Sequence, residues 1–256
     1  MPTALVTGAT AGIGAAFTRH LAADGYRLVI VARDVGRLHE CRATLLSFGA
    51  PEVEIIAADL VIADQRASVT ARLAAGGIDL LVNNAGIGLG KDFLVASEAE
   101  LLGQLEINVT ALMLLTRAAL PQMVARGHGG VINVASVAGL IPGRGTTYAG
   151  SKAYVISLSE GLAMSLAGTG VRVQALCPGF VRTEFHQRAS IDMTKAPARA
   201  YVDIDELVVT SLRDLRRNKI VSVPGRLYAT MAVVTRLLPR GLVRQFAARV
   251  NNRGRT

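Results

Sequence analysis

Hydrophobic and polar positions along the chain follow two alternating patterns. Seven short runs are rich in Val, Ile and Leu, on even and odd positions alike: residues 4–7, 28–31, 53–57, 80–82, 131–134, 171–176 and 220–223. Between them, longer segments repeat apolar residues at helical spacing: 13–23, 35–48, 63–75, 98–126, 147–167 and 204–217. Strands that are apolar on both faces belong in a sheet covered on both sides. The pattern therefore predicts an α/β fold with a doubly wound, mostly parallel, seven-stranded sheet and helices on both faces.

Composition indicates a single domain spanning residues 1–256. Hydrophobic residues make up 51% of the chain, which is ample for one packed core, and no linker, charge block or repeat divides it. Cys41 and Cys177 are too few for a disulfide framework or a CxxC metal site, and the four histidines lack ligand spacing. We therefore predict no metal site.

The formal net charge of +9 is concentrated near the end of the chain, where residues 213–256 contain eleven Lys and Arg residues against one acid, Asp214. Such a segment can meet nucleic acid, anionic lipid or phosphorylated ligands, or can form a solvated face. No nucleic-acid-binding motif accompanies it, and it lacks a run of aromatic residues on which bases stack. We predict no nucleic-acid partner.

Residues 225–256 read as a basic amphipathic segment with two helical stretches separated by Pro239. Such a segment can associate weakly with an anionic membrane surface, or it can pack on the core with a solvated basic side. The N-terminus lacks the basic region of a secretory signal. We expect a cytoplasmic protein, with peripheral membrane association as an open alternative.

A glycine-rich turn separates the first predicted strand from the first predicted helix. In the stretch VTGATAGIGAAF, Gly8, Gly12 and Gly14 have the spacing GxxxGxG. Glycine permits a tight turn and lets backbone N–H groups approach a pyrophosphate at a helix N-terminus. Because the turn stands between a strand and a helix, it predicts a dinucleotide-binding site.

The end of the second strand bears on the choice of nucleotide. An acid at this tip hydrogen-bonds the ribose of NAD(H), whereas an arginine accommodates the 2′-phosphate of NADP(H). Ala32 holds the tip and Arg33 follows it, while Asp34 directly precedes a helix, where Asp is a favoured N-cap. We interpret Arg33 as a phosphate ligand and Asp34 as a cap, and predict NADP(H) rather than NAD(H).

Tyr148 and Lys152 stand four residues apart in the predicted helix 147–167, so their side chains project from one face. A free phenol has a pKa of about 10 and is a poor acid–base group at neutral pH. An ammonium about 4 Å away stabilises the phenolate by about 4 kcal/mol at an effective dielectric near 20. This reasoning predicts that the pKa of Tyr148 falls towards about 7, which suits proton transfer.

Together these features resemble the short-chain dehydrogenase/reductase family, from the first strand to about Val223. The matching pieces are residues 7–14, Asp59-Leu60, residues 83–86, Asn108, Ser136, Tyr148 with Lys152, and Pro178-Gly179 with Thr183. The resemblance implies a Rossmann-like fold and a catalytic tetrad of Asn108, Ser136, Tyr148 and Lys152, of which Ser136 and Tyr148 contact the substrate. With the turn and Arg33, the implied cofactor-binding set is Gly8, Thr10, Gly12, Ile13, Gly14, Arg33, Asp59, Leu60, Asn84, Ala85, Gly86, Tyr148, Lys152, Pro178, Val181 and Thr183.

The resemblance also implies a homodimer or homotetramer built partly on helices 98–126 and 147–167. Ala11 departs from the pattern, because many NADP-preferring members carry a basic residue there, and Gly150 stands where alanine is usual. Glu106, two residues before Asn108, is expected to face solvent.

The substrate is expected to be a small lipophilic molecule. Residues 182–204 form the least regular segment and suit a lid. The lid and the tail supply apolar side chains for a pocket: Phe185, Ile191, Met193, Leu227, Met231, Leu237 and Leu238. We expect an NADP(H)-dependent oxidoreductase acting on a lipophilic ketone or a long-chain 3-oxoacyl or steroid-like substrate. The alternative is a non-catalytic protein that senses NADP(H) or scaffolds a complex.

Overall fold

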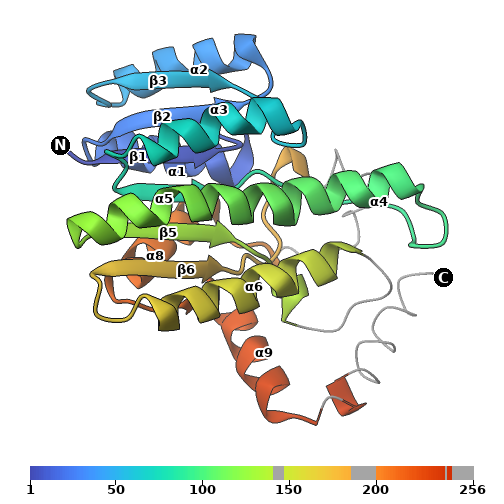
Figure 1. Cartoon of the computed structure of the whole chain (residues 1–256). Helices are drawn as coiled ribbons and strands as arrows, with labels where there is room; N and C mark the ends of the chain where they lie inside the picture. Colours follow the sequence, from blue (N-terminus) through green and yellow to red (C-terminus); the bar gives the residue numbers. More distant parts are fainter. Residues whose placement is uncertain (141–146, 186–199, 240, 244–256) are drawn as a thin grey trace.

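One parallel sheet organises the computed structural model, which describes residues 1–140, 147–185, 200–239 and 241–243. Its seven strands have the order β3-β2-β1-β4-β5-β6-β7 (Figure 1). They are β1 (Thr3–Thr7), β2 (Arg27–Ala32), β3 (Val53–Ala57), β4 (Leu80–Asn83), β5 (Gly129–Val134), β6 (Val171–Leu176) and β7 (Val221–Ser222). Every neighbouring pair is parallel, so the predicted sheet is confirmed.

Helices cover both faces of the sheet (Figure 1). One face carries α1 (Gly12–Ala23), α2 (Val35–Ser47) and α8 (Ile204–Arg216), and the other carries α3 (Ala63–Ala74), α4 (Glu98–Leu105), α5 (Leu112–Arg126) and α6 (Thr147–Ser165). In β1, Ala4 and Val6 belong to the first core layer and Leu5 to the second. Because side chains alternate between faces, a strand buried on both sides is apolar throughout.

The predicted helix 98–126 consists of α4, a π-helical turn η1 (Glu106–Ala111) and α5. Among the described residues, this is the one helix whose length and composition would allow it to cross a membrane. Leu112, Leu115 and Met123 are nevertheless buried in the core layers beside the sheet. Packing within the protein therefore explains part of its hydropathy, since 39% of its apolar window is buried.

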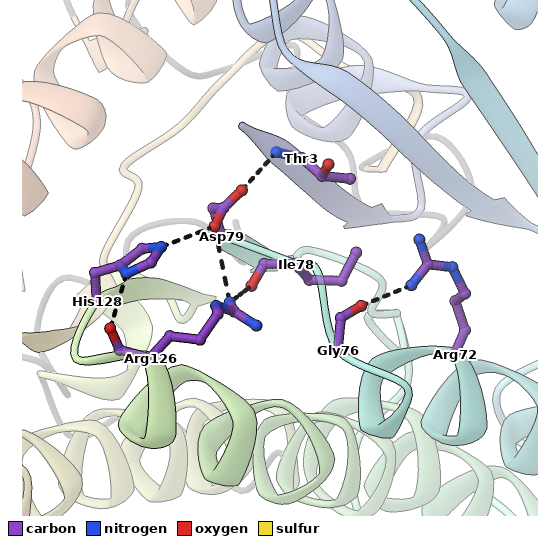
Figure 2. Close-up of polar contacts among 7 residues, drawn as sticks. All are labelled: Thr3, Arg72, Gly76, Ile78, Asp79, Arg126 and His128. Carbon is purple, nitrogen blue, oxygen red and sulfur yellow. Dashed lines mark hydrogen bonds and ion pairs between the residues drawn. The ribbon is translucent and has the colours of Figure 1, made fainter. Parts of the chain in front are cut away.

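Asp79 joins three elements at the amino-terminal edge of the sheet, as Figure 2 shows. Its carboxylate accepts a hydrogen bond from the Thr3 backbone N–H at 2.8 Å, and lies 3.3 Å from His128 and 3.7 Å from Arg126. Arg126 also donates to the Ile78 carbonyl at 2.6 Å. These contacts tie the start of β1 to the end of α5 and the start of β5. They lie at the opposite edge from the glycine-rich turn, so we assign them to stability.

Candidate active site

The glycine-rich turn between β1 and α1 has a backbone that other residues adopt poorly. Gly8 and Gly12 have φ angles of 64° and 52°, and a Cβ on Gly14 would lie 2.2 Å from the Gly8 carbonyl oxygen. The N-cap residue of α1, Ala11, supplies no capping side chain. The N–H groups at this helix N-terminus can therefore face an anion.

The segment after β4 fastens this turn to the middle of the sheet. The Asn84 side-chain amide donates to the carbonyls of Thr7 and Gly8 at 2.9 and 3.2 Å. In return, the Thr7 hydroxyl accepts from the backbone N–H groups of Asn84 and Ala85, both at 3.0 Å. Asn83 donates to Asn133 at 2.9 Å and so braces β4 against β5. The segment is thus held against the glycine-rich turn.

Arg33 and Asp59 face each other beyond the ends of β2 and β3. The Arg33 guanidinium is 65% exposed and lies 3.6 Å from the Asp59 carboxylate. Asp34 accepts a hydrogen bond from the Arg37 backbone N–H at 3.0 Å and caps α2, which confirms its predicted role. Asp34 is engaged in the cap, whereas the Arg33 guanidinium is exposed at this tip.

Asn108 connects the segment after β4 with α6. It lies in the π-helical turn, and its side chain both accepts from the Ile87 backbone N–H and donates to the Ile87 carbonyl, each at 2.9 Å. It also donates to the Ser151 hydroxyl at 3.3 Å. Buried and fully engaged, Asn108 positions the backbone near Tyr148 and Lys152.

Glu106, in the same turn, does not simply face solvent as expected. Its carboxylate lies 2.7 Å from the guanidinium of Arg66, a buried arginine on α3. A buried cation needs a charged partner, and Glu106 provides it.

Ser136, Tyr148 and Lys152 come together between β5 and α6. Ser136 begins the 3₁₀ turn η2 (Val137–Gly139) and hydrogen-bonds the Tyr148 side chain. The Lys152 ammonium is 4% exposed, donates to the Val134 carbonyl at 2.7 Å and lies 5.7 Å from the Tyr148 ring centre. Tyr148 and Lys152, predicted to be neighbours on one helix, therefore form a cluster with the hydroxyl of Ser136.

Burial determines the charge state of this cluster. Desolvation lowers the pKa of Lys152 to about 8, and Cys177 opposes that shift. Desolvation raises the pKa of Tyr148 to about 12, opposed by the hydrogen bond with Ser136. The predicted fall of the Tyr148 pKa towards 7 is therefore wrong for this chain by itself. That prediction counted the attraction of Lys152 and left out the cost of ionising a buried phenol.

The segment after β6, residues 177–185, runs from the sheet to the glycine-rich turn. The Pro178 carbonyl accepts from the Val137 N–H at 3.0 Å, and Val181 is buried. The Thr183 side chain packs on Gly12, because a Cβ added to Gly12 would lie 3.1 Å from the Thr183 Cβ. The Phe185 ring centre lies 5.7 Å from that of Tyr148. Residues 186–199, most of the predicted lid, lie outside the described residues.

The remaining predicted cofactor residues lie along the same edge. Thr10 belongs to the turn, and its carbonyl accepts from Arg37 at 3.1 Å. Ile13 packs on the core under α1, and Leu60 is buried beside Asp59. Gly86 contacts Asn108, whose side-chain oxygen would lie 2.9 Å from an added Cβ. The structure thus brings the whole predicted set to the carboxyl ends of the strands.

Sequence reasoning missed Gln104, which is fully buried. Its amide donates to the Ile87 carbonyl at 3.3 Å and its side-chain oxygen accepts from the Thr147 hydroxyl, next to Tyr148. A polar side chain four residues before Asn108, on the same helical face, was the available signal.

Comparisons with known proteins agree with this geometry. The family model described as short chain dehydrogenase matches residues 2–194. A probable NADP-dependent dehydrogenase of Haemophilus influenzae is 41% identical over 192 residues, covering 72% of this chain and 73% of that protein.

Two solved structures extend the likeness to nearly the whole chain. A short-chain dehydrogenase from Sphingobium yanoikuyae in complex with NADPH has a TM-score of 0.84 and 34% identity, covering 94% of this chain and 97% of that one. A bulky-bulky ketone specific alcohol dehydrogenase from Comamonas testosteroni has a TM-score of 0.79 and 30% identity, covering 100% and 95%. The chain therefore belongs to the short-chain dehydrogenase family of oxidoreductases.

Proposed function

We propose that this protein is an NADP(H)-dependent oxidoreductase that transfers hydride between the nicotinamide and a carbonyl or alcohol group. The observation that carries the proposal is the hydrogen-bonded pair of Ser136 and Tyr148 beside the buried cation of Lys152. This cluster shares one edge of the sheet with the glycine-rich turn, so a nucleotide and a substrate can meet there.

The residues in and around the glycine-rich turn fit a dinucleotide. The turn has no room for a side chain at Gly14 and offers uncapped N–H groups for a pyrophosphate. Arg33 has an exposed guanidinium for a 2′-phosphate, and Asp59 stands opposite for the adenine side. The bound nicotinamide would supply or accept the hydride. The NADPH complex of the Sphingobium relative supports the choice of NADP(H).

The chain's own residues would handle the proton. Ser136 would hydrogen-bond the substrate oxygen while Tyr148 donates its phenolic proton to it, and the cation of Lys152 would stabilise the phenolate that forms. The raised pKa of Tyr148 keeps the phenol protonated at neutral pH, which is the form that carbonyl reduction requires.

A non-catalytic NADP(H) sensor or scaffold is the alternative. Such a protein would gain nothing from a buried, desolvated ammonium next to a phenol, because that arrangement costs stability. This cost argues for the enzyme.

Arg33→Ala should weaken NADPH binding about 10- to 150-fold and change NADH binding little, because a charge-assisted contact to phosphate contributes roughly 1.5–3 kcal/mol. Titration of nicotinamide fluorescence measures both affinities. Arg42→Ala, at an exposed position on α2, is the matched control and should change neither. Equal losses for NADPH and NADH would show that Arg33 does not read the 2′-phosphate.

We propose a lipophilic ketone, or a long-chain 3-oxoacyl or steroid-like compound, as the substrate. Phe185 places an apolar ring beside Tyr148, and the Comamonas relative is specific for bulky-bulky ketones. The predicted contribution of the tail needs correction, because Leu227, Met231, Leu237 and Leu238 are exposed on and beside α9 (Arg226–Leu237). Ile191 and Met193 lie outside the described residues.

A series of linear ketones of increasing length tests this substrate class, with NADPH absorbance as the readout. Each methylene buried in an apolar pocket contributes about 0.8 kcal/mol. We expect kcat/KM to rise with chain length until the pocket is full. A flat or falling trend beyond about five carbons would remove the lipophilic substrate and leave the reductase assignment standing.

We propose that α9 binds weakly to the surface of anionic membranes. The helix extends away from the sheet (Figure 1), and its large apolar side chains are 39–79% exposed: Leu227, Met231, Val233, Val234 and Leu237. An apolar face of this kind on a soluble chain marks an interaction site. Residues 226–256 contain seven arginines and no acid, a composition that complements anionic lipid. The protein would then be cytoplasmic and peripheral to the membrane.

Sedimentation with vesicles containing phosphatidylserine tests this proposal. Val234→Ser with Leu237→Ser should reduce the bound fraction severalfold, whereas Leu46→Ser, at an exposed apolar site on α2, should not. If a second copy of the chain covers α9 instead, the double variant will lower the mass measured by light scattering and leave lipid binding unchanged.

We also propose a homodimer or homotetramer built partly on helix 98–126, which comprises α4, η1 and α5, and on α6. Both helices expose large side chains, namely Leu102, Leu105, Tyr154 and Met164. A shallow groove along α6 is lined by Tyr154, Ser157, Leu158, Gly161, Leu162 and Ser165. Light scattering of the unmodified protein gives the number of subunits.

A further inference from the structure

An ion pair crosses the glycine-rich turn between two segments far apart in the sequence. The Arg37 guanidinium, in the first turn of α2, donates to both carboxylate oxygens of Glu184, at 2.9 and 3.2 Å. The same guanidinium donates to the Thr10 carbonyl within the turn at 3.1 Å. One side chain thus joins α2, the glycine-rich turn and the segment after β6.

The neighbours of Glu184 lie against the two working parts of the proposed site. Thr183 packs on Gly12 at the start of α1, and Phe185 packs on the ring of Tyr148. Three consecutive residues therefore contact the turn, α2 and the tyrosine in succession. If the ion pair breaks, the contacts of Thr183 and Phe185 lose the interaction that holds the segment between them in place.

The bond to Thr10 has a consequence for the turn itself. A peptide unit is planar, so holding the Thr10 carbonyl also fixes the direction of the Ala11 N–H. This N–H belongs to the helix N-terminus that would meet the pyrophosphate. Arg37 therefore orients a donor of the proposed nucleotide site while it anchors the segment that covers it.

We propose that Arg37 and Glu184 are positioning residues, whose ion pair closes residues 183–185 over the pyrophosphate site and slows the release of the nicotinamide cofactor. This inference rests on the proposed function. Both side chains are partly exposed, at 36% and 45%, so the pair can open and close without disturbing the core. Its bidentate geometry makes it stronger than a typical surface pair.

A competing role for Arg37 is direct contact with the 2′-phosphate, since Arg33 lies only four residues before it in the sequence. The two roles predict different patterns. A phosphate ligand would affect NADPH and not NADH, and removing Glu184 would then strengthen NADPH binding by releasing the arginine. A positioning pair affects both cofactors, and its two members behave alike.

The test measures dissociation rates of NADPH and NADH by stopped-flow fluorescence for the unmodified protein, Arg37→Gln, Glu184→Gln and the double variant. We expect each single variant to speed the release of both cofactors about 3- to 10-fold, and the double variant to release them no faster than the singles. The KM for NADPH should rise in parallel. Glu52→Gln, an exposed acid that pairs with Arg27 at the opposite edge of the sheet, is the control and should leave both rates unchanged.

Additive effects in the double variant, or an effect on NADPH alone, would overturn the inference. Unchanged release from the single variants would also overturn it, while the proposed function stands if the unmodified protein binds NADPH and oxidises it in the presence of a ketone. If the unmodified protein binds neither cofactor, the proposed function and this inference fail together.

Discussion

Tyr148→Phe is expected to lower kcat by about 10²–10⁴-fold and to leave NADPH binding nearly unchanged. The substitution removes the one phenol that is hydrogen-bonded to Ser136 and beside the cation of Lys152. The ring that packs on Phe185 remains, so the shape of the site is preserved. Steady-state turnover with a ketone substrate and titration of NADPH fluorescence measure the two quantities separately.

The matched control is Tyr154→Phe, two residues after Lys152 on the same helix. Tyr154 is 39% exposed and its hydroxyl contacts the sulfur of Met113, away from the proposed site. This variant should keep full activity. Retention of more than about a tenth of kcat by Tyr148→Phe, which equals a barrier change of only ~1.4 kcal/mol, would contradict the role of the phenol.

Lys152→Met should remove activity and also remove a pH dependence of stability. Burial lowers the folded-state pKa of Lys152 to about 8 from an ordinary value of 10.5. Between these two values the unfolded chain binds more protons than the folded protein, so the stability of the unmodified protein rises with pH across this window. Below pH 8 the group carries its proton in both states, and the burial cost is present in full.

The size of this effect follows from the pKa difference. A shift from 10.5 to about 8 corresponds to at most about 3 kcal/mol. Relative to Lys152→Met, the unmodified protein should therefore gain up to about 3 kcal/mol of unfolding free energy between pH 8 and 10.5. The hydrogen bond to the Val134 carbonyl is also lost in the variant. The dependence of this bond on the charge of Lys152 is already contained in the folded-state pKa, so it adds no further pH dependence.

Urea unfolding at several pH values measures this difference. Arg42→Met, at an exposed position on α2, serves as the control and should run parallel to the unmodified protein across the same window. Parallel curves for Lys152→Met would show that Lys152 titrates normally in the folded protein. Activity should vanish in either case, because the cation that stabilises the phenolate is gone.

The architecture could be predicted because its signals are local. Each strand of the sheet is recognisable in the sequence as a run of consecutive apolar residues. In the run from Leu28 to Val31, alternate side chains belong to the two core layers. The glycine-rich turn and the cap at Asp34 depend on a few neighbouring residues and their backbone preferences. The adjacency of Tyr148 and Lys152 follows from the helical repeat alone.

The tertiary structure decided what surrounds these groups. The direction of the Tyr148 pKa reversed because ionisation of a phenol depends on how much water the rest of the fold removes, which spacing on one helix does not reveal. Glu106 pairs with the buried Arg66, which lies on the separate helix α3. The apolar residues expected in the pocket lie exposed on α9, because the direction of that helix depends on its packing through Tyr228.

The sequence by itself therefore determined the order of elements, the glycine-rich turn and the adjacency of Tyr148 and Lys152, since each is set by residues within one or two turns of chain. Only the tertiary structure decided the charge states and the contacts between distant segments, such as that of Arg37 with Glu184, 147 positions apart. The physical reason is that desolvation and ion pairing depend on distances in space, which the folded chain alone establishes.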